Sequence, residues 1–295
     1  MSGPRRILAG AARDALLGVR FVNGRGEAIR NGGRVMKNVT GLDLVKLMAG
    51  SWGTLGLITE VAFKVLPRPE TEITLAVDGH DAAEGAMLMA RAMGTSAEVS
   101  AAAHLPGPVA GGVLGDGRTG RPTTLLRLEG FAVSIAERIG RLKPQLGADL
   151  EIAELDAAVS QRAWAAIRDV SAFADGTDTP VWRISAAPMA GHAAAADILA
   201  RTEGEAFFDW QGGLVWLRLS GDDPQAERVR ASLAAHGGGH ALLVRANEAA
   251  RARTAVFQPE PAPVAAISEK IRASIDPGGV FNCGRRPFAS ARKAA

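Results

Sequence analysis

The middle of the chain contains an internal repeat, and this repeat limits the possible folds more than any other feature of the sequence. Each copy shows strand and helix patterns in the order β-α-β-β-α-β, first over 70–155 and again over 181–246. The third strands even share letters, because LRLEG at 126–130 matches LRLSG at 217–221. This order is that of the ferredoxin-like motif. We therefore predict an antiparallel-sheet domain of two ferredoxin-like copies over 70–262, with a bridging helix at 154–170. Inside the first copy, 107–120 has the glycine-rich composition of a flexible loop.

The segment before the repeat, residues 1–69, has the pattern of a smaller α+β domain. A strand at 16–22 and its return at 27–30 predict a hairpin, with Asn23-Gly24 supplying the turn residues with φ > 0. Thr40 and Asp43 then fit a capping box at the start of a helix over 42–49, whose apolar residues predict burial.

A glycine turn at 50–56 joins that helix to a predicted strand over 57–66, which Pro67 and Pro69 end as a domain boundary. On this strand Leu57, Val61 and Phe63 share one face, which predicts a half-buried strand. The last segment, 263–295, contains an amphipathic helix and a short tail.

Bulk composition excludes several classes of protein. At 47% hydrophobic and 22% charged, the 295-residue chain can bury a core and is not disordered. Its 34 basic and 31 acidic residues leave a formal charge of only +3, with the basic residues scattered, which predicts no nucleic-acid partner. No run reaches the ~20 apolar residues of a membrane helix, so we expect a cytoplasmic protein with no membrane span. The single cysteine, Cys283, can form neither an internal disulfide nor an iron–sulfur site by itself.

The glycine turn is the first candidate for chemistry. Glycines in GSWGTLG at 50–56 permit close approach of a ligand, and the backbone N–H groups of such a turn suit a phosphate or the polar edge of a nucleotide. A structural turn between a helix and a strand explains the same residues. The residues alone therefore leave both interpretations open, with the structural one favoured.

Three motifs in order carry a resemblance to a known family. Residues 35–69 read VMKNVTGLDLVKLMAGSWGTLGLITEVAFKVLPRP, the chain opens with SGPRRILAGAARDALLG, and FNCGR stands at 281–285. Together they resemble the FAD-binding domain of the vanillyl-alcohol oxidase/p-cresol methylhydroxylase (PCMH) superfamily, and within it the FAD-binding E subunits of bacterial glycolate oxidase. The family has tyrosine where this chain has Leu42, and proline where it has Cys283.

The resemblance implies an α+β fold and a set of FAD contacts. Residues 1–69 would be the latter half of a PCMH-type FAD-binding domain, and 263–295 would return to it. The implied contacts near the adenine and the turn are Gly53, Thr54, Gly56 and Ile58. The implied contacts on the ribityl or isoalloxazine side are Gly3, Pro4, Gly10 and Ala12.

The function implied by the resemblance is that of an FAD-dependent oxidoreductase subunit. It would act in a glycolate (2-hydroxy acid) oxidase complex, with a catalytic D-type flavin subunit and an iron–sulfur F-type subunit that receives the electrons. The alternative is a non-catalytic assembly subunit, since the metal or base motif of related hydroxy-acid dehydrogenases, His-x-Gly-Asp/Glu-Gly-Asn, is absent and no catalytic residue can be assigned. The family's glycine loop for the FAD pyrophosphate is also missing ahead of Gly3, so we expect the chain to bind FAD poorly by itself.

Three arginines stand in the middle of predicted strands of the repeat: Arg127, Arg183 and Arg218. An arginine can hold the carboxylate of a 2-hydroxy acid through two hydrogen bonds, although an arginine on the solvent face of a strand is the more common case. We prefer Arg183 as the substrate contact because Trp182-Arg183 resembles a recurrent family feature. The five histidines and the tryptophans at 164, 182, 210 and 216 are interpreted as core or turn residues, and no metal site is predicted.

Overall fold

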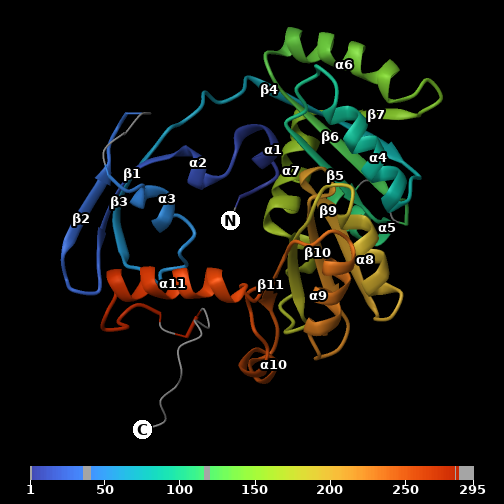
Figure 1. Ribbon diagram of the computed structural model, residues 1–295. Helices are drawn as coiled ribbons and strands as arrows, with labels where there is room; N and C mark the ends of the chain where they lie inside the picture. Colours follow the sequence, from blue (N-terminus) through green and yellow to red (C-terminus); the bar gives the residue numbers. More distant parts are fainter. Residues whose placement is uncertain (1, 36–40, 116–119, 283, 286–295) are drawn as a thin grey trace. The chain divides into compact units, whose positions relative to one another are not determined.

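The computed structural model describes residues 2–35, 41–115, 120–282 and 284–285 (Figure 1). The chain forms two compact units. Unit 1 consists of Met1–Ser2, Gly10–Pro67 and Pro259–Ala295, and unit 2 consists of Gly3–Ala9 and Arg68–Gln258. The opening segment Gly3–Ala9 thus packs with the repeat, whereas the sequence pattern grouped it with the first domain. No helix among the described residues is long and apolar enough to cross a membrane.

Unit 2 is built on one eight-stranded sheet with the strand order β11-β8-β10-β9-β5-β6-β4-β7. Its strands are β4 Thr71–Asp78, β5 Ala101–Leu105, β6 Thr123–Gly130, β7 Ile152–Leu155, β8 Val181–Ser185, β9 Gly204–Asp209, β10 Leu214–Leu219 and β11 His240–Arg245. All pairs are antiparallel, and the two halves meet where His104 of β5 pairs with Phe208 of β9. Within each half the fourth strand lies beside the first, then the third and the second, so both copies of the repeat have the same pairing order.

Helices cover both faces of this sheet (Figure 1). On one face lie α4 Ala82–Met93, α6 Ala132–Leu146, α8 Gly191–Leu199 and α9 Ala226–Ala235, over cores that include Leu126, Ile139, Trp182 and Leu217. On the other face lie α7 Ala157–Asp169 and α5 Gly107–Leu114, together with α1 Arg6–Ala9 and the 3-10 turn η1 Ser171–Phe173. Helix α10, Glu248–Arg253, follows β11. Most side chains of the buried strands therefore pack against helices on either face.

Helix α5 corrects the sequence prediction of a flexible glycine-rich loop at 107–120. Val109 and Ala110 are at most 2% exposed and Leu114 is 8% exposed, so the segment buries an apolar face against α7. The free energy gained by burying these side chains outweighs the low helix propensity of the glycines. Residues 116–119 lie outside the described part.

A buried polar cluster attaches α7 to the sheet. The Trp164 indole N–H donates to Thr74 Oγ1 (2.8 Å), which is also 2.7 Å from Ser160 Oγ, and Ser160 Oγ donates to Glu72 Oε1 (2.6 Å). Thr74 and Ser160 are fully buried. Each hydroxyl therefore needs its partner, because an unsatisfied buried polar group is costly.

We expect Trp164→Phe to lower the free energy of unfolding by about 2–3 kcal/mol, because it removes one buried hydrogen bond and leaves part of the indole's volume in the core empty. Urea unfolding followed by circular dichroism measures this loss. Thr74→Val removes the acceptor of the same bond, so the two changes combined should cost less than their sum. Additive losses would show that the bond contributes nothing.

Unit 1 is smaller. It contains α2 Ala12–Ala15, β1 Leu16–Val22, β2 Ala28–Gly32, α3 Leu44–Met48, β3 Leu57–Phe63 and α11 Ala262–Ile275. The strands form an antiparallel sheet in the order β2-β1-β3, so the predicted hairpin of β1 and β2 is confirmed. Its core consists of Leu16, Val19, Phe21, Val45, Met48 and Leu55, with Ile271 and Ile275 of α11 against it.

The structure corrects three local predictions in unit 1. In the hairpin loop the positive φ (80°) belongs to Gly26 and not to Gly24, because Asn23 Oδ1 accepts from the amides of Arg25 and Glu27 and shapes the loop. Helix α3 begins after Asp43, whose side chain accepts from the Lys46 amide (3.0 Å). Thr40, the predicted cap, lies outside the described residues.

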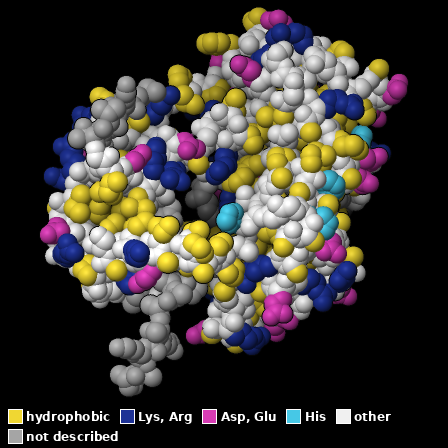
Figure 2. All heavy atoms as spheres, in the orientation of Figure 1, with side chains coloured by type: hydrophobic (Ala, Val, Ile, Leu, Met, Phe, Trp, Pro, Cys, Tyr) yellow, Lys and Arg dark blue, Asp and Glu magenta, His cyan; other side chains and the backbone are white. Residues whose placement is uncertain are grey.

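The third correction concerns burial. Leu42, predicted inside a buried helix, is 79% exposed because it precedes the helix. Strand β3 is an edge strand whose residues are exposed except for half-buried Ala62, although an apolar face was predicted to be half-buried. Leu57, Ile58, Val61 and Phe63 are 41–60% exposed. Exposed apolar side chains stand among charged ones on the surface of the molecule (Figure 2).

Candidate functional site

The glycine turn connects α3 to β3 in unit 1. The Ser51 amide donates to Met48 O (3.2 Å), and both the amide and the hydroxyl of Thr54 donate to Ser51 O, at 3.1 and 2.6 Å. Gly50 and Gly53 have φ of +90° and +70°, a conformation that glycine adopts without strain. Within the described part of the chain, the amides of Gly53 and Leu55 have no hydrogen-bond acceptor. The turn therefore offers backbone donors, which suits the polar groups of a nucleotide such as FAD.

The glycines serve the packing of the turn as well. A Cβ on Gly56 would lie 2.7 Å from Val22 O, so the missing side chain lets the turn approach β1. A Cβ on Gly53 would lie 2.9 Å from Nδ2 of Asn282, which donates to Gly53 O (2.9 Å). Both readings that the sequence left open thus have support: Gly56 is needed structurally, and Gly53 presents its backbone.

The turn also borders a cavity of about 230 Å³ within unit 1. Arg13, Ser51, Thr54 and Ser268 are among its lining residues. Thr54 is 3% exposed and its hydroxyl already donates to Ser51 O. A ligand in this cavity could therefore use only the lone pairs of the Thr54 hydroxyl, as a hydrogen-bond acceptor.

The remaining predicted FAD contacts are divided between the units. Gly10, with φ of +75°, and Ala12, the first residue of α2, belong to unit 1. Ile58 lies on β3, opposite Phe21 of β1. Gly3 and Pro4 belong to unit 2, where Pro4 is buried. The structure therefore brings Gly3 and Pro4 into the same unit as Arg183.

Two of the three mid-strand arginines of unit 2 have internal partners. Arg218 forms ion pairs with Asp175 (2.5 Å) and Glu205 (2.6 Å). Arg127 is 6% exposed, donates to Ser100 Oγ (3.2 Å) and lies 3.7 Å from a Glu129 carboxylate oxygen. These contacts give Arg127 and Arg218 structural roles.

Arg183 differs from both. Its guanidinium carbon lies 4.9 Å from the centroid of the Trp210 ring, and its Nε is buried without a hydrogen-bond partner. Among the described residues it forms no ion pair. Burial lowers the pKa of Arg183, the positive charge of Arg6 lowers it further, and Asp209 raises it. An arginine with unused donors is the group that a carboxylate ligand would satisfy.

Trp210 is the platform for this arginine. It begins the 3-10 turn η2, Trp210–Gly212, between β9 and β10, and it has φ of 53° while Gln211 has φ of 61°. Its amide donates to Asp209 Oδ1 (2.7 Å) and its indole N–H donates to Gly3 O (3.0 Å). Left-handed non-glycine residues cost energy and often occur at functional sites. These bonds hold the indole in place and connect Gly3 to Arg183 through it.

Sequence reasoning missed Arg6, Asp209 and the conformation of Trp210. The guanidinium carbon of Arg6 lies 4.6 Å from the Trp210 ring centroid. Asp209 is 2% exposed, and burial raises the pKa of its carboxyl to about 7, against the effects of the Trp210 amide, Arg127 and Arg183. The interpretation of Trp210 as a core residue is consistent with its 6% exposure, but no sequence signal marks a tryptophan with positive φ.

The histidines show no sign of catalysis. His104 is buried and its Nδ1 is 3.0 Å from Thr124 Oγ1, and burial lowers its pKa to about 4. The core interpretation is therefore correct for His104. In the described residues, no three His, Cys, Asp or Glu side chains gather as a metal site would require. Cys283 lies outside those residues.

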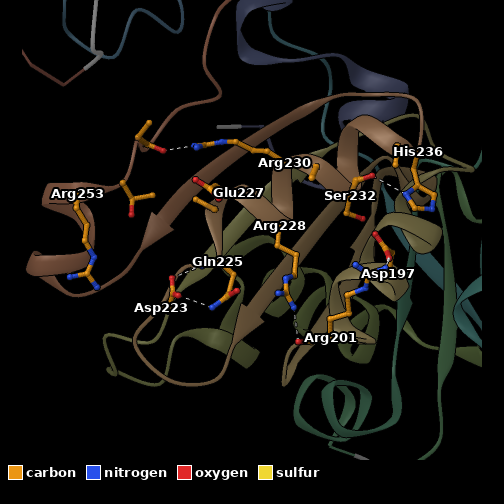
Figure 3. Close-up of a pocket in the computed structure, with 15 residues that line it drawn as sticks. Asp197, Arg201, Asp223, Gln225, Glu227, Arg228, Arg230, Ser232, His236 and Arg253 are labelled. Carbon is orange, nitrogen blue, oxygen red and sulfur yellow. Dashed lines mark hydrogen bonds and ion pairs between the residues drawn. The ribbon is translucent and has the colours of Figure 1, made fainter.

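A pocket of about 1000 Å³ lies elsewhere in unit 2, over α8, α9 and α10 (Figure 3). It contains none of the predicted site residues. Its charged groups largely bind one another or the backbone: Arg228 donates to Arg201 O (2.8 Å), Arg230 donates to Phe257 O (3.1 Å) and Gln225 donates to Asp223 (2.7 Å). Because the lining mixes both charge signs and several of these groups already have partners, this pocket is a weaker candidate than the Trp210 platform.

Comparison with known proteins identifies the family. No family model matches the chain. Over 97% of its length it is 32% identical to glycolate oxidase subunit GlcE of Escherichia coli, covering 69% of that protein. Over 25% of its length it is 45% identical to glycolate oxidase subunit GlcD of Bacillus subtilis, covering 16% of it.

Among solved structures, p-cresol methylhydroxylase with bound substrate superposes with a TM-score of 0.60 at 14% identity, over 89% of this chain. The chain spans 63% of that structure. This likeness confirms the predicted α+β fold of the PCMH type. Because the similarity to GlcE extends through both units, the chain belongs to the glycolate oxidase subunit GlcE family of FAD-dependent oxidoreductases.

Proposed function

We propose that the chain is the FAD-binding subunit of a cytoplasmic complex that oxidises glycolate or a closely related 2-hydroxy acid. Its partners would be a catalytic D-type flavin subunit and an iron–sulfur F-type subunit that accepts the electrons. The observation that carries this proposal is the continuous similarity to GlcE over 97% of the chain, which includes both the glycine turn and the Trp210 platform.

In unit 1 the amides around Gly53 and the main chain of Gly56 and Ile58 would hold FAD, with Thr54, Gly10 and Ala12 beside them. In unit 2 Gly3 and Pro4 would contribute further contacts, and Arg183 would hold the substrate carboxylate through its unused donors. When bound, FAD supplies the oxidation chemistry, so the chain's task is to bind and orient.

Glycolate-dependent reduction of a dye by the complex, purified with D-type and F-type subunits, tests the proposal. We expect Arg183→Gln to lower kcat/KM for glycolate about 10- to 100-fold, because it removes a charge-assisted bond to the carboxylate. Arg162→Gln is the matched control, since Arg162 is exposed on α7 and its replacement makes the same change of charge. Equal kinetics for Arg183→Gln and wild type would remove Arg183 from the site.

A second candidate role is assembly without a flavin of its own. The exposed apolar side chains of edge strand β3 favour it, because such a strand is suited to pairing with another polypeptide. The flavin content of the complex separates the two roles. A chain that binds FAD adds one flavin per complex to that of the D-type subunit, whereas an assembly subunit adds none.

A further inference from the structure

The surface around Trp210 carries a second arginine that the proposed function does not use. Arg6 stands on α1 at the start of unit 2, and its guanidinium carbon is 4.6 Å from the Trp210 ring centroid. Its neighbour Arg5 forms an ion pair with Glu129 (3.1 Å), which Arg127 also approaches. No carboxylate pairs with Arg6 among the described residues. Arg6 and Arg183 are thus two cations on one indole, and neither forms an ion pair among the described residues.

The indole that both arginines contact is held at several points. Its backbone amide is bound by buried Asp209, its ring N–H by Gly3 O, and its left-handed φ sets the direction of the side chain. A cation stacked on tryptophan is attracted by the ring, most strongly where water is excluded. Trp210 is 6% exposed, Arg183 is half-buried and Arg6 is exposed, so the attraction to the ring is stronger for Arg183 than for Arg6.

We propose that Arg6 and Arg183 together form a two-arginine site on Trp210 that binds the carboxylate of a small 2-hydroxy acid. This inference rests on the proposed function, because it assigns a second substrate contact to the same site. The physical reason is charge balance. Stacking on an aromatic ring orients a guanidinium but leaves its N–H donors available, and two such groups repel each other until an anion lies between or beside them.

The nearby carboxylates do not supply that anion. Glu129 already receives Arg5 and Arg127. Asp209 is near enough to raise the pKa of Arg183, but it is 2% exposed, it accepts from the Trp210 amide and it forms no ion pair with Arg183 among the described residues. Arg6 is exposed, so a small carboxylate from solution can reach it, and its positive charge is near enough to lower the pKa of Arg183. In the proposed site the carboxylate would accept from both guanidinium groups. A neutral analogue such as glycolamide lacks the charge and should bind far more weakly.

Steady-state kinetics of the assembled complex are the first test. We expect Arg6→Gln to raise KM for glycolate about tenfold with kcat changed less than about twofold, since the contact is to a part of the substrate that does not react. Arg6→Lys keeps the charge but loses the planar donors, so its KM should lie between those of Arg6→Gln and wild type. Arg162→Gln should leave KM unchanged.

Direct binding is the second test, and it separates this inference from the proposed function. Glycolate and glycolamide are titrated into the full chain while tryptophan fluorescence is followed, with Trp210→Phe identifying the signal from that residue. We expect a saturable change with glycolate only, weakened about tenfold in Arg6→Gln. Such binding by a complex that does not oxidise glycolate would overturn the proposed function and support the site. Unchanged binding and unchanged KM in Arg6→Gln, or no saturable change in wild type, would overturn the site.

Discussion

Replacing Gly85 by alanine is expected to lower the free energy of unfolding by about 3 kcal/mol, the upper range for overpacking of a core. Gly85 lies in α4, and a Cβ there would be 2.3 Å from Nδ1 of His104 on β5. The imidazole cannot move away easily, because it is 1% exposed, lies 3.0 Å from Thr124 Oγ1 and packs against Phe208. The helix must then shift from the sheet. Urea unfolding measures the loss.

Gly140→Ala is the matched control. Gly140 is also in the interior of a helix, α6, but it is exposed and a Cβ there meets nothing within 4 Å. Alanine favours helix over glycine, so this variant should gain up to about 1 kcal/mol. In a His104→Ala background the space opens, and Gly85→Ala should become neutral or stabilising. If Gly85→Ala cost the same in both backgrounds, the contact with His104 would not be its cause.

Much of the repeat domain could be predicted because its strands and helices follow simple periodic patterns. Strand β6 at Thr123–Gly130 and strand β10 at Leu214–Leu219 match the predicted strands closely, since their apolar residues are buried by helices on the faces of the sheet. At α5 the glycine-rich composition predicted a loop, but burial of Val109 and Leu114 decides the structure despite the glycines. In unit 1 the pattern of β3 predicted a buried face that no element of that unit covers among the described residues.

The candidate site was less accessible to sequence reasoning. A mid-strand arginine can be solvent-facing, paired or available, and only the ion pairs of Arg218 and the buried bonds of Arg127 distinguish them from Arg183. The role of Arg183 stays a prediction. The sequence could not place Arg6 beside Arg183, because the contact of Arg6 with Trp210 joins two segments that lie far apart in the sequence and meet only in the folded chain. The FAD contacts likewise stay predictions, supported by the open amides of the glycine turn.

Asp209 gives unit 2 an unusual dependence of stability on pH. Burial raises the pKa of its carboxyl from 3.8 to about 7 in the folded protein, despite the opposing charges of Arg127 on β6 and Arg183 on β8. Between about pH 4 and pH 7 the folded chain therefore holds a proton that the unfolded chain has lost. Stability rises with pH only where the unfolded state binds more protons, so this group makes stability fall as pH increases through that window.

His104, with its pKa lowered from 6.5 to about 4, has the opposite effect on stability between those pH values, because the folded chain then binds fewer protons than the unfolded chain.

Asp209→Asn isolates the aspartate from the histidine. The amide oxygen of asparagine can still accept from the Trp210 amide, but it cannot ionise. At pH 8 the variant should be more stable than wild type by roughly 2–4 kcal/mol, the linkage value of a shift of about three pKa units. At pH 4 the difference should shrink to well under about 1 kcal/mol, because the folded wild-type carboxyl is then protonated and the unfolded one, with a pKa near 3.8, is only partly ionised. Urea unfolding of both proteins from pH 4 to pH 8 measures the difference, in which the contribution of His104 cancels. A difference that stays constant over this range would mean that Asp209 does not change its charge there, and that the positive charges of Arg127 and Arg183 keep its carboxylate ionised.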